Sequence, residues 1–408
     1  MTHQILSDGS ATTPRGFSAA AVAAGIKQSG RPDLVLVFSD HDCTAAGVFT
    51  RNRVAAAPVI VDRATLATNN SAIRGVVINS GNANACTGEP GLANAREMQR
   101  LASEELGGSP DQYLVMSTGV IGVPLPIERV RSGILIAAPS LSPDNGIAAA
   151  EGIMTTDTRP KHLAIEIQLP GGTVTLGGMA KGAGMIHPDM ATLLGVVTTD
   201  AAVSADDLAT MLREAADRSF NAISIDGDTS TNDTILLLAN GAGGVSVNDA
   251  ESRELFANAL NELCHALAMM VVSDGEGVTR VVTVHVTGAR TESDARRVAN
   301  TIATSPLVKT AFAGGDPNWG RILAATGRSG VDLDQSRLAL WIGVGDEPPL
   351  QIVRDGTPTN FVEADAAAVF AQPVFTVRVD LGDGSAETVL WTTDLTHDYV
   401  TINADYRT

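Results

Sequence analysis

The amino-acid sequence predicts an α+β fold in which β-sheets are layered against α-helices. Short segments rich in Val and Ile are interspersed with longer amphipathic segments, and the pattern of strand and helix begins again near residue 193. The segments do not follow the strict strand–helix alternation of a doubly wound parallel sheet. With 408 residues, of which 44% are hydrophobic, the chain can bury a sizeable core and is too long for one small domain.

The first half of the chain contains predicted strands, then mainly helices, then a β-hairpin. Segments rich in β-branched residues and bounded by turn residues predict strands, and apolar residues at helical spacing predict helices. A hairpin is expected between His162 and Leu176, because apolar residues alternate with polar ones up to a Pro-Gly-Gly turn. The other strands are expected at residues 34–38, 47–50, 59–62, 74–79 and 113–116, and the helices at 92–106, 127–138 and 146–154.

In the second half of the chain, two helix starts carry capping residues. Ser204 is followed three positions later by Asp207, and Thr291 is followed by Asp294, so each hydroxyl can cap the N-terminus of a helix. A longer helix is expected at residues 252–272. The predicted strands are 193–198, 234–239, 281–286, 338–343, 351–354, 375–380 and 388–392.

The composition disfavours nucleic acid and membranes as partners. Lys and Arg number 28 and Asp and Glu number 46, and the resulting net charge of −18 repels phosphate backbones and anionic lipids. Cys43, Cys86 and Cys264 form no CxxC pair, so we expect no disulfide framework and a reducing, cytoplasmic location. The first residues lack the pattern of a signal peptide, and no apolar run is long enough to span a membrane.

Several common binding and catalytic motifs do not occur in the sequence. The seven histidines show no pair at metal-ligand spacing, and the loop from Asp226 to Asp233 departs from an EF-hand at its sixth and twelfth positions. The glycine-rich segment around Lys181 lacks the flanking residues that a P-loop requires. No serine lies in a GxSxG motif, and Cys86 is expected to be a small buried hydrophobe. We therefore expect no metal site and no phosphate-binding loop.

Thr192 is a candidate nucleophile. It follows a glycine-rich segment and Ala191, at the point where the strand pattern begins again. A threonine hydroxyl needs a base, and cleavage of the chain before Thr192 would place an α-amino group beside that hydroxyl. Such an amine has a pKa of about 7.7–8.0, so it can take and return a proton near neutral pH. From the residues alone, a threonine that simply begins a strand remains the alternative.

Thr118 and Gly119 are candidates for an oxyanion hole. They lie where a predicted strand ends in a turn that contains glycine. A tetrahedral oxyanion needs two preorganised donors, and the Thr118 hydroxyl and the Gly119 backbone N–H could supply them. An ordinary strand-to-loop turn is the alternative interpretation.

Taken together, the motifs resemble those of the ornithine acetyltransferase family, the bifunctional glutamate N-acetyltransferases of arginine biosynthesis. The resemblance extends along nearly the whole chain, and the combination of motifs is specific although each one alone is weak. The motifs are GVFTRN (47–52), NSGNANAC (79–86), STGVIG (117–122), TTDT (155–158), GMAKGAGM (178–185), MAT (190–192), DGEG (274–277), GDPNWGR (315–321) and YVTINADY (399–406).

This resemblance implies a self-cleaving enzyme with a layered αββα sandwich like that of N-terminal nucleophile hydrolases. Cleavage between Ala191 and Thr192 would give an α chain, residues 1–191, and a β chain, residues 192–408, assembled as a heterotetramer of two α and two β chains. The family's nucleophile corresponds to Thr192, and its oxyanion hole corresponds to Thr118 and Gly119. Its substrate-binding positions correspond to Thr155, Lys181, Thr192, Glu276, Asn403 and Thr408.

The resemblance also implies the activity, which is transfer of the acetyl group of N-acetylornithine to glutamate through an acetyl-Thr192 intermediate. No cofactor is implied, and acetyl-CoA is a further acetyl donor for some members. Lys181 is a natural counter-ion for a substrate carboxylate, and Glu276 for an ammonium group. Two alternatives stay open: a self-processing amidase or aminopeptidase of the same fold, with water as acceptor, and a non-catalytic solute-binding protein.

Overall fold

The computed structural model describes residues 3–187 and 193–404, which divide into two compact units. The first unit contains residues 3–182, 193–221 and 229–271, and the second contains the remaining described residues. This division does not follow the α and β chains implied by cleavage. Strands from both sides of residue 192 pair within the first unit, so cleavage there would leave the two chains interleaved in one sheet.

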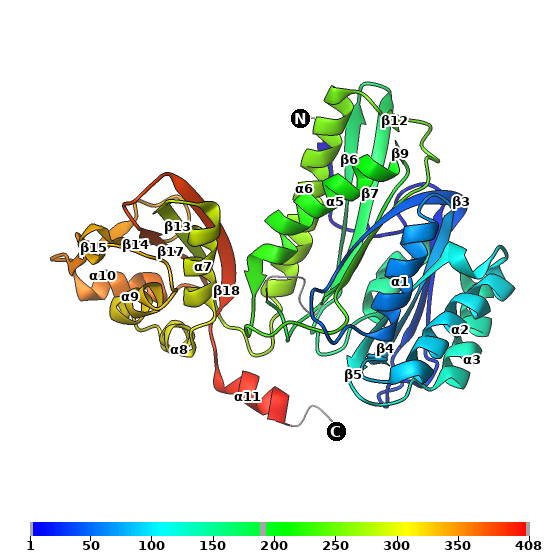
Figure 1. Ribbon diagram of the computed structural model, residues 1–408, viewed down its shortest axis with the longest axis horizontal. Helices are drawn as coiled ribbons and strands as arrows, with labels where there is room; N and C mark the ends of the chain where they lie inside the picture. The colour runs from blue at the N-terminus through cyan, green and yellow to red at the C-terminus, as the bar shows by residue number, and fades with distance from the viewer. Residues whose placement is uncertain (1–2, 188–192, 405–408) are drawn as a thin grey trace. The chain divides into compact units, whose positions relative to one another are not determined.

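Two sheet layers of the first unit share one long strand, β3 (Leu34–Phe49) (Figure 1). The first half of β3 pairs with β4 (Ile73–Asn82), and its second half pairs with β11 (Thr234–Ala239). A register shift between Phe38 and Cys43 marks the passage between the layers. The strand order is β1-β6-β7-β8-β11-β3-β4-β5, with β2 beside β3. The other strands are β1 (His3–Leu6), β2 (Phe17–Val22), β5 (Tyr113–Val120), β6 (Lys161–Leu169), β7 (Gly172–Lys181) and β8 (Leu194–Thr199).

Helices cover the outer faces of both layers, which confirms the α+β class and the αββα sandwich. Val35 and Val76 of one layer pack with Leu236 of the other in the core between them. The opposite face of the β3–β4 layer packs against α1, α2 and α3. On the other layer, a side chain on Gly178 of β7 would meet Leu267 of α6, and α5 lies beside α6 (Figure 1). The helices are α1 (Ala57–Thr68), α2 (Gly88–Leu106), α3 (Ile127–Ala137), α4 (Gly146–Gly152), α5 (Ala205–Arg218) and α6 (Ala250–Val272).

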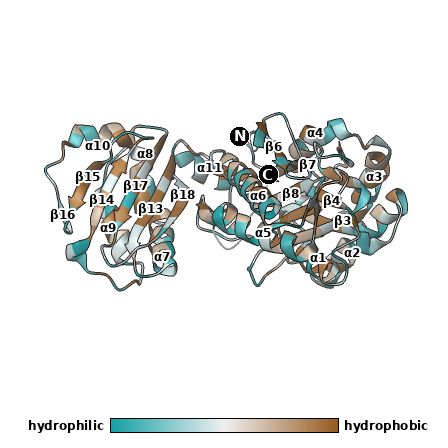
Figure 2. Ribbon diagram, turned by 90° about the horizontal axis from the view of Figure 1, so that it is seen from above, coloured by the Kyte–Doolittle hydropathy of each residue, from teal (hydrophilic) through white to brown (hydrophobic). Residues whose placement is uncertain are grey.

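The second unit is built on another sheet, with strand order β10-β18-β13-β17-β14-β15-β16 among the described residues. Apolar colouring runs along its strands in Figure 2, and helices α7–α10 pack against them. Phe312, Phe370 and Phe375 form an aromatic cluster with ring centroids 4.7–5.8 Å apart. The elements are β10 (Ile223–Ser224), β13 (Val281–Ala289), β14 (Ala339–Gly343), β15 (Leu350–Arg354), β16 (Thr357–Pro358), β17 (Val374–Asp380), β18 (Ala386–Thr393), α7 (Glu292–Ala303), α8 (Pro306–Gly314), α9 (Trp319–Gly327), α10 (Glu363–Phe370) and α11 (His397–Ala404).

Short elements complete the two units. Strands β9 (Ala202–Val203) and β12 (Ser246–Val247) pair with each other in parallel. The 3₁₀ turns are η1 (Pro110–Gln112), η2 (Ala138–Ser140), η3 (Pro143–Asn145), η4 (Phe220–Ala222) and η5 (Gln335–Arg337).

Both predicted helix caps are confirmed. The Ser204 hydroxyl accepts a hydrogen bond from the backbone N–H of Asp207 at 3.3 Å, at the start of α5. The Thr291 hydroxyl accepts one from the N–H of Asp294 at 3.1 Å, at the start of α7. These bonds satisfy donors that the first turn of a helix leaves without partners.

The strand predicted at residues 59–62 is wrong, because these residues lie within α1. A short apolar run of Val and Ile does not distinguish strand from helix by its periodicity. Pro58 stands in the first turn of α1, where its missing N–H costs no hydrogen bond. The strand predicted at 47–50 is the end of β3 rather than a separate element. Strands β1 and β2 and helices α8–α11 had no counterpart in the prediction.

Helix α6 is the one described helix that is long and apolar enough to cross a membrane, by length and composition alone. Within the first unit its side chains Phe256, Leu260 and Leu263 are fully buried. Half of its apolar window is covered by other parts of the protein. Helices of a protein core share this composition. We therefore interpret α6 as a core helix of the first unit.

We expect Leu236→Ala, in the core between the layers, to lower the free energy of unfolding by about 2–5 kcal/mol, because it leaves a cavity. Urea unfolding followed by circular dichroism measures this change. Leu135→Ala on α3 is the matched control, since Leu135 is 50% exposed, and should change the free energy by less than about 0.5 kcal/mol. Equal effects of the two substitutions would contradict the layered core.

Candidate active site

Thr118 and Gly119 lie at the end of β5, opposite Ser80 and Gly81 of the parallel strand β4. Thr118 is buried. Gly119 has a φ of +132°, and a Cβ there would lie 2.2 Å from the carbonyl carbon of Gly81. Only glycine fits such a conformation and such a close backbone approach. The β5 turn is therefore more constrained than an ordinary strand-to-loop turn.

The loop that precedes β11 holds this turn through hydrogen bonds. The Asn232 side-chain amide donates hydrogen bonds to the carbonyl oxygens of Ala83, at 2.6 Å, and Ser117, at 2.8 Å. The Ser117 hydroxyl donates in turn to the Asn79 side chain at 2.6 Å. The backbone on both sides of the predicted oxyanion hole is thus held by buried polar groups.

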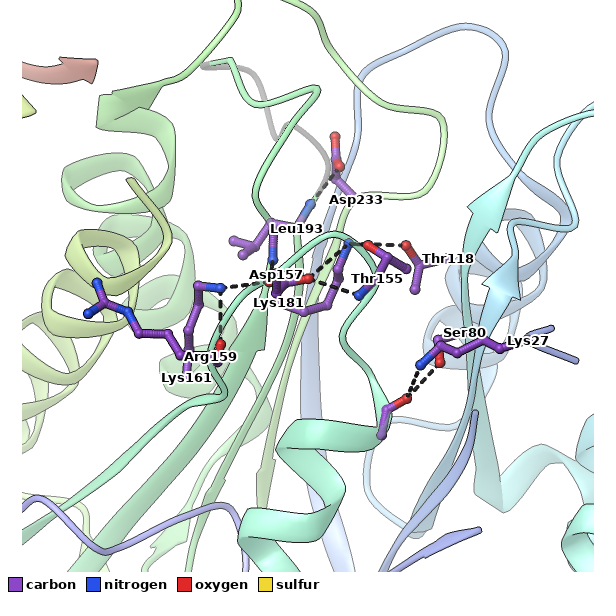
Figure 3. Close-up of polar contacts among 12 residues, drawn as sticks. Lys27, Ser80, Thr118, Thr155, Asp157, Arg159, Lys161, Lys181, Leu193 and Asp233 are labelled. Atoms are coloured by element: carbon purple, nitrogen blue, oxygen red, sulfur yellow. Dashed lines mark hydrogen bonds and ion pairs between the residues drawn. The ribbon is translucent and has the colours of Figure 1, made fainter. Parts of the chain in front are cut away.

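Lys181, the last residue of β7, brings together three of the predicted site residues. Its side chain is only 3% exposed. Its ammonium donates hydrogen bonds to the Thr155 hydroxyl at 2.6 Å and to the Thr118 hydroxyl at 3.5 Å (Figure 3). Lys181 is therefore a buried cation within a polar site, and not a surface charge.

A buried carboxylate, Asp157, organises the positive side of the site. Its Oδ1 atom accepts hydrogen bonds from the Lys161 ammonium and the Gly182 backbone N–H, each at 2.7 Å. Its Oδ2 atom accepts one from the Thr155 N–H at 2.9 Å and lies 3.8 Å from the Lys181 ammonium (Figure 3). Burial alone would raise the pKa of Asp157, but these cations and hydrogen bonds hold that pKa well below its usual value. Asp157 is therefore ionised at neutral pH.

The sequence around Asp157 does not by itself predict a catalytic or binding role for this residue. The residue lies within the TTDT motif (155–158), and Lys161 follows four positions later. An aspartate in a polar turn has the sequence pattern of a solvated residue. The TTDT motif was thus the one signal that could have drawn attention to it.

Glu276 and Asn403 form a second group of predicted site residues, within the second unit. The Asn403 side-chain amide, on α11, donates a hydrogen bond to Glu276 Oε2 at 2.7 Å. The Glu276 N–H donates to the Ala183 carbonyl oxygen at 2.8 Å. A Cβ on Gly184 would lie 2.4 Å from Glu276 Oε2, so the glycine leaves room for the carboxylate. Glu276 is buried and in direct contact with Asn403.

Three predicted site residues, Ala191, Thr192 and Thr408, lie outside the described residues. The structure therefore gathers Thr118, Thr155 and Lys181 in one unit, and Glu276 and Asn403 in the other. The cleavage between residues 191 and 192 and the role of Thr192 as nucleophile stay predictions.

Cys86 corrects one expectation, because it is exposed rather than buried. It has a φ of +56° in the turn before α2, and the neighbouring Ala83 and Ala85 take the buried positions instead. Cys43 and Cys264 are buried, and burial raises the pKa of each thiol to about 12. Among residues 3–187 and 193–404, no three His, Cys, Asp or Glu side chains gather as a metal site would require.

Comparison with known proteins gives extensive matches. Residues 18–408 match the ArgJ family. The chain is 52% identical to the arginine biosynthesis bifunctional protein ArgJ of Symbiobacterium thermophilum, over 98% of this chain and 99% of that protein. It is 47% identical to the protein of the same name from Chlorobium chlorochromatii, over 97% of this chain and 91% of that protein. The solved ornithine acetyltransferase of Mycobacterium tuberculosis, complexed with ornithine, is 39% identical, with 46% of this chain and 98% of that chain covered and a TM-score of 0.43.

These relatives define a class, the bifunctional enzymes of arginine biosynthesis. The chain belongs to the ArgJ family of that class and is an acetyltransferase. The family identified from the motifs is thereby confirmed. Membership also excludes a non-catalytic solute-binding protein.

We expect Asp157→Asn to lower the free energy of unfolding at pH 7 by about 3–5 kcal/mol, because Lys161 and Lys181 would lose their buried carboxylate. Since the folded state lowers the pKa of Asp157, its stabilising contribution is present above the unfolded pKa of about 3.9 and is lost as the pH falls below it. Urea unfolding at pH 7 and at pH 3 measures both effects.

The exposed Asp40→Asn is the control for this experiment and should leave stability unchanged at both pH values. An Asp157→Asn variant as stable as Asp40→Asn would contradict the role of Asp157 as the shared counter-ion.

Proposed function

We propose that the protein transfers the acetyl group of N-acetylornithine to glutamate, which gives ornithine and N-acetylglutamate. The observation that carries the proposal is the buried contact of Lys181 with Thr118 and Thr155 at the edge where β8 begins. Lys181 is the register partner of Leu194, which lies two residues after Thr192 in the chain. Lys181 therefore links the predicted oxyanion hole on β5 to the start of β8, the strand that follows Thr192 in the chain.

Thr192 would become the nucleophile by cleavage of the chain between Ala191 and Thr192. Cleavage releases an α-amino group on Thr192, and this amine acts as the base for the neighbouring hydroxyl. The products would be the α chain, residues 1–191, and the β chain, residues 192–408. Pairing of β7 with β8 and of β3 with β11 supports a complex that stays assembled after cleavage.

The reaction would proceed in two acyl-transfer steps. The Thr192 amine takes the hydroxyl proton as Oγ1 attacks the acetyl carbonyl carbon, and the oxyanion forms against the Thr118 hydroxyl and the Gly119 N–H. The amine then returns the proton to the departing nitrogen of ornithine, and acetyl-Thr192 remains. In the second step the glutamate amine attacks this ester, and the threonine hydroxyl is restored.

Side chains of opposite charge would recognise different chemical groups of the substrates. The Lys181 ammonium and the Thr155 hydroxyl suit an α-carboxylate, which both N-acetylornithine and glutamate carry. The Glu276 carboxylate suits the ammonium group of ornithine, and Asn403 holds that carboxylate in place. Thr408 would add a further contact from the end of the chain.

The remaining features of the proposal follow from the family and the composition. No cofactor is required, and acetyl-CoA would serve as a second acetyl donor in a bifunctional enzyme. The unpaired state of Cys43, Cys86 and Cys264 supports a cytoplasmic location. The assembly would be a heterotetramer of two α and two β chains.

Incubation of the enzyme with N-acetylornithine and glutamate should yield ornithine and N-acetylglutamate in equal amounts, measured by mass spectrometry. On a denaturing gel the active enzyme should run as two bands of about half the 42.1 kDa chain. Thr192→Ala should stay a single intact chain and form neither product. Release of acetate in place of N-acetylglutamate would instead indicate an amidase with water as acceptor.

Thr118→Ala should lower kcat by about 10²-fold or more, because it removes one of the two oxyanion donors. Steady-state kinetics with N-acetylornithine measure kcat and KM separately. Thr118→Ser, which keeps the hydroxyl, is the matched control and should retain most of the activity. An unchanged kcat in Thr118→Ala would remove this hydroxyl from the oxyanion hole.

A further inference from the structure

Asp233 is a fully buried carboxyl group that the acetyl-transfer mechanism does not use. It lies directly before β11, the strand that pairs with β8 on one side and β3 on the other. Its backbone carbonyl accepts a hydrogen bond from the Thr50 N–H at 2.9 Å. The backbone of Asp233 is therefore fixed at the start of β11, a strand that has neighbours on both sides.

The Asp233 carboxyl is bound to the chain beside the predicted cleavage site. Its Oδ1 atom accepts a hydrogen bond from the Leu193 backbone N–H at 2.9 Å (Figure 3). The Thr234 N–H donates to the Leu193 carbonyl oxygen at 3.0 Å, so Leu193 is held on both of its sides. The nitrogen of Leu193 is bonded covalently to the carbonyl carbon of Thr192. The carboxyl thus binds the backbone N–H of the residue that directly follows Thr192 in the chain.

The second oxygen of this carboxyl is available for proton transfer. Among the described residues, Oδ2 of Asp233 is buried and has no hydrogen-bond partner. Burial raises the pKa of Asp233 well above its usual value, and the Leu193 N–H, the Thr50 hydroxyl, the Ser230 backbone and the Lys181 ammonium of β7 offset only part of that effect. An acid with a raised pKa exchanges protons near neutral pH more readily than an ordinary aspartate.

We propose that Asp233 is the acid–base residue of the self-cleavage between Ala191 and Thr192. The inference rests on the proposed function, since it assumes that this bond is cleaved. In the first step, ionised Asp233 takes the proton of the Thr192 hydroxyl as Oγ1 attacks the Ala191 carbonyl carbon. The Ala191–Thr192 C–N bond then breaks, and Asp233 returns the proton to the Thr192 nitrogen. Water hydrolyses the resulting ester, which gives the Ala191 carboxylate and restores the Thr192 hydroxyl.

In this role Asp233 would supply the base that the uncleaved chain needs before the Thr192 α-amine exists. Before cleavage, the nitrogen of Thr192 is part of an amide and cannot serve as a base. The α-amine that activates Thr192 in acetyl transfer is therefore absent from the step that creates it. A different group must move the first proton, and Asp233 is a buried carboxyl bound to the N–H of Leu193, the next residue in the chain.

Asp62 provides a matched control within the same unit. It too is fully buried, accepts one backbone N–H, that of Val115 at 2.8 Å, and has a second oxygen without a partner among the described residues. Burial raises its pKa as well. It lies on α1 against β5 and is not bound to Leu193. Asp62→Asn and Asp233→Asn therefore make the same change to two similar carboxyl groups in different places.

The test follows cleavage of newly synthesised full-length chain in a cell-free system, by denaturing gel over time at several pH values. Asp233→Asn keeps an oxygen for the Leu193 N–H but cannot take a proton, so cleavage should slow by about 10²-fold or more. Asp62→Asn should cleave at the wild-type rate. In the wild type the rate should rise with pH as Asp233 ionises and then level off, and Asp233→Asn should lack that rise.

Circular dichroism and thermal unfolding of the uncleaved Asp233→Asn chain separate chemistry from folding. A folded chain that cleaves slowly and without the pH-dependent rise supports the proposal. Cleavage of Asp233→Asn at the wild-type rate, or equal slowing in Asp62→Asn, would overturn it. If the wild-type chain itself stays intact while Thr192→Ala makes no difference, the proposed self-cleavage fails, and that outcome is distinct from failure of the Asp233 role.

Discussion

The arrangement of the first unit depends on one buried carboxylate, that of Asp157. Lys161 begins β6 and Lys181 ends β7, so both ammonium groups lie at the open end of the same hairpin. A buried charge without a partner costs several kcal/mol, and two buried cations side by side also repel each other. Asp157 balances them while it accepts the N–H groups of Thr155 and Gly182. The turn before the hairpin and the segment after it are thereby held together.

Under the proposed acetyl transfer, charge balance at Asp157 would also prepare Lys181 to bind a substrate carboxylate. A flexible lysine would lose side-chain entropy each time it bound a substrate carboxylate. Lys181 is already held between Asp157 and Thr155, so little of that cost remains. The Gly119 turn is equally fixed, because its backbone lies against Gly81 with no space for a side chain. Donors placed before the reaction need no reorganisation during it.

Features that depend on a few neighbouring residues in the chain could be predicted from the sequence. Features that depend on contacts between distant segments could not. The hairpin between residues 162 and 176 and the helices capped by Ser204 and Thr291 were predicted, because alternation and capping act within a few residues. Residues 59–62 lie in a helix although their pattern also suits a strand, because the periodicity of such a short apolar run is ambiguous. Thr118 and Lys181 could be named through family motifs. Asp157 and Asp233 could not, because burial of a carboxyl beside a particular partner is a property of the assembled sheets.

The shared sheet has a consequence for how the mature protein would denature. Before cleavage, β8 and β11 are tethered to β7 and β3 by the chain, so refolding is intramolecular and independent of concentration. After cleavage between residues 191 and 192, unfolding would release two molecules that must meet again to rebuild the same sheet. Resistance to heat would then increase with protein concentration, and dilution would make inactivation effectively irreversible. The precursor and the mature enzyme would share one architecture and yet differ in whether that architecture can be recovered once lost.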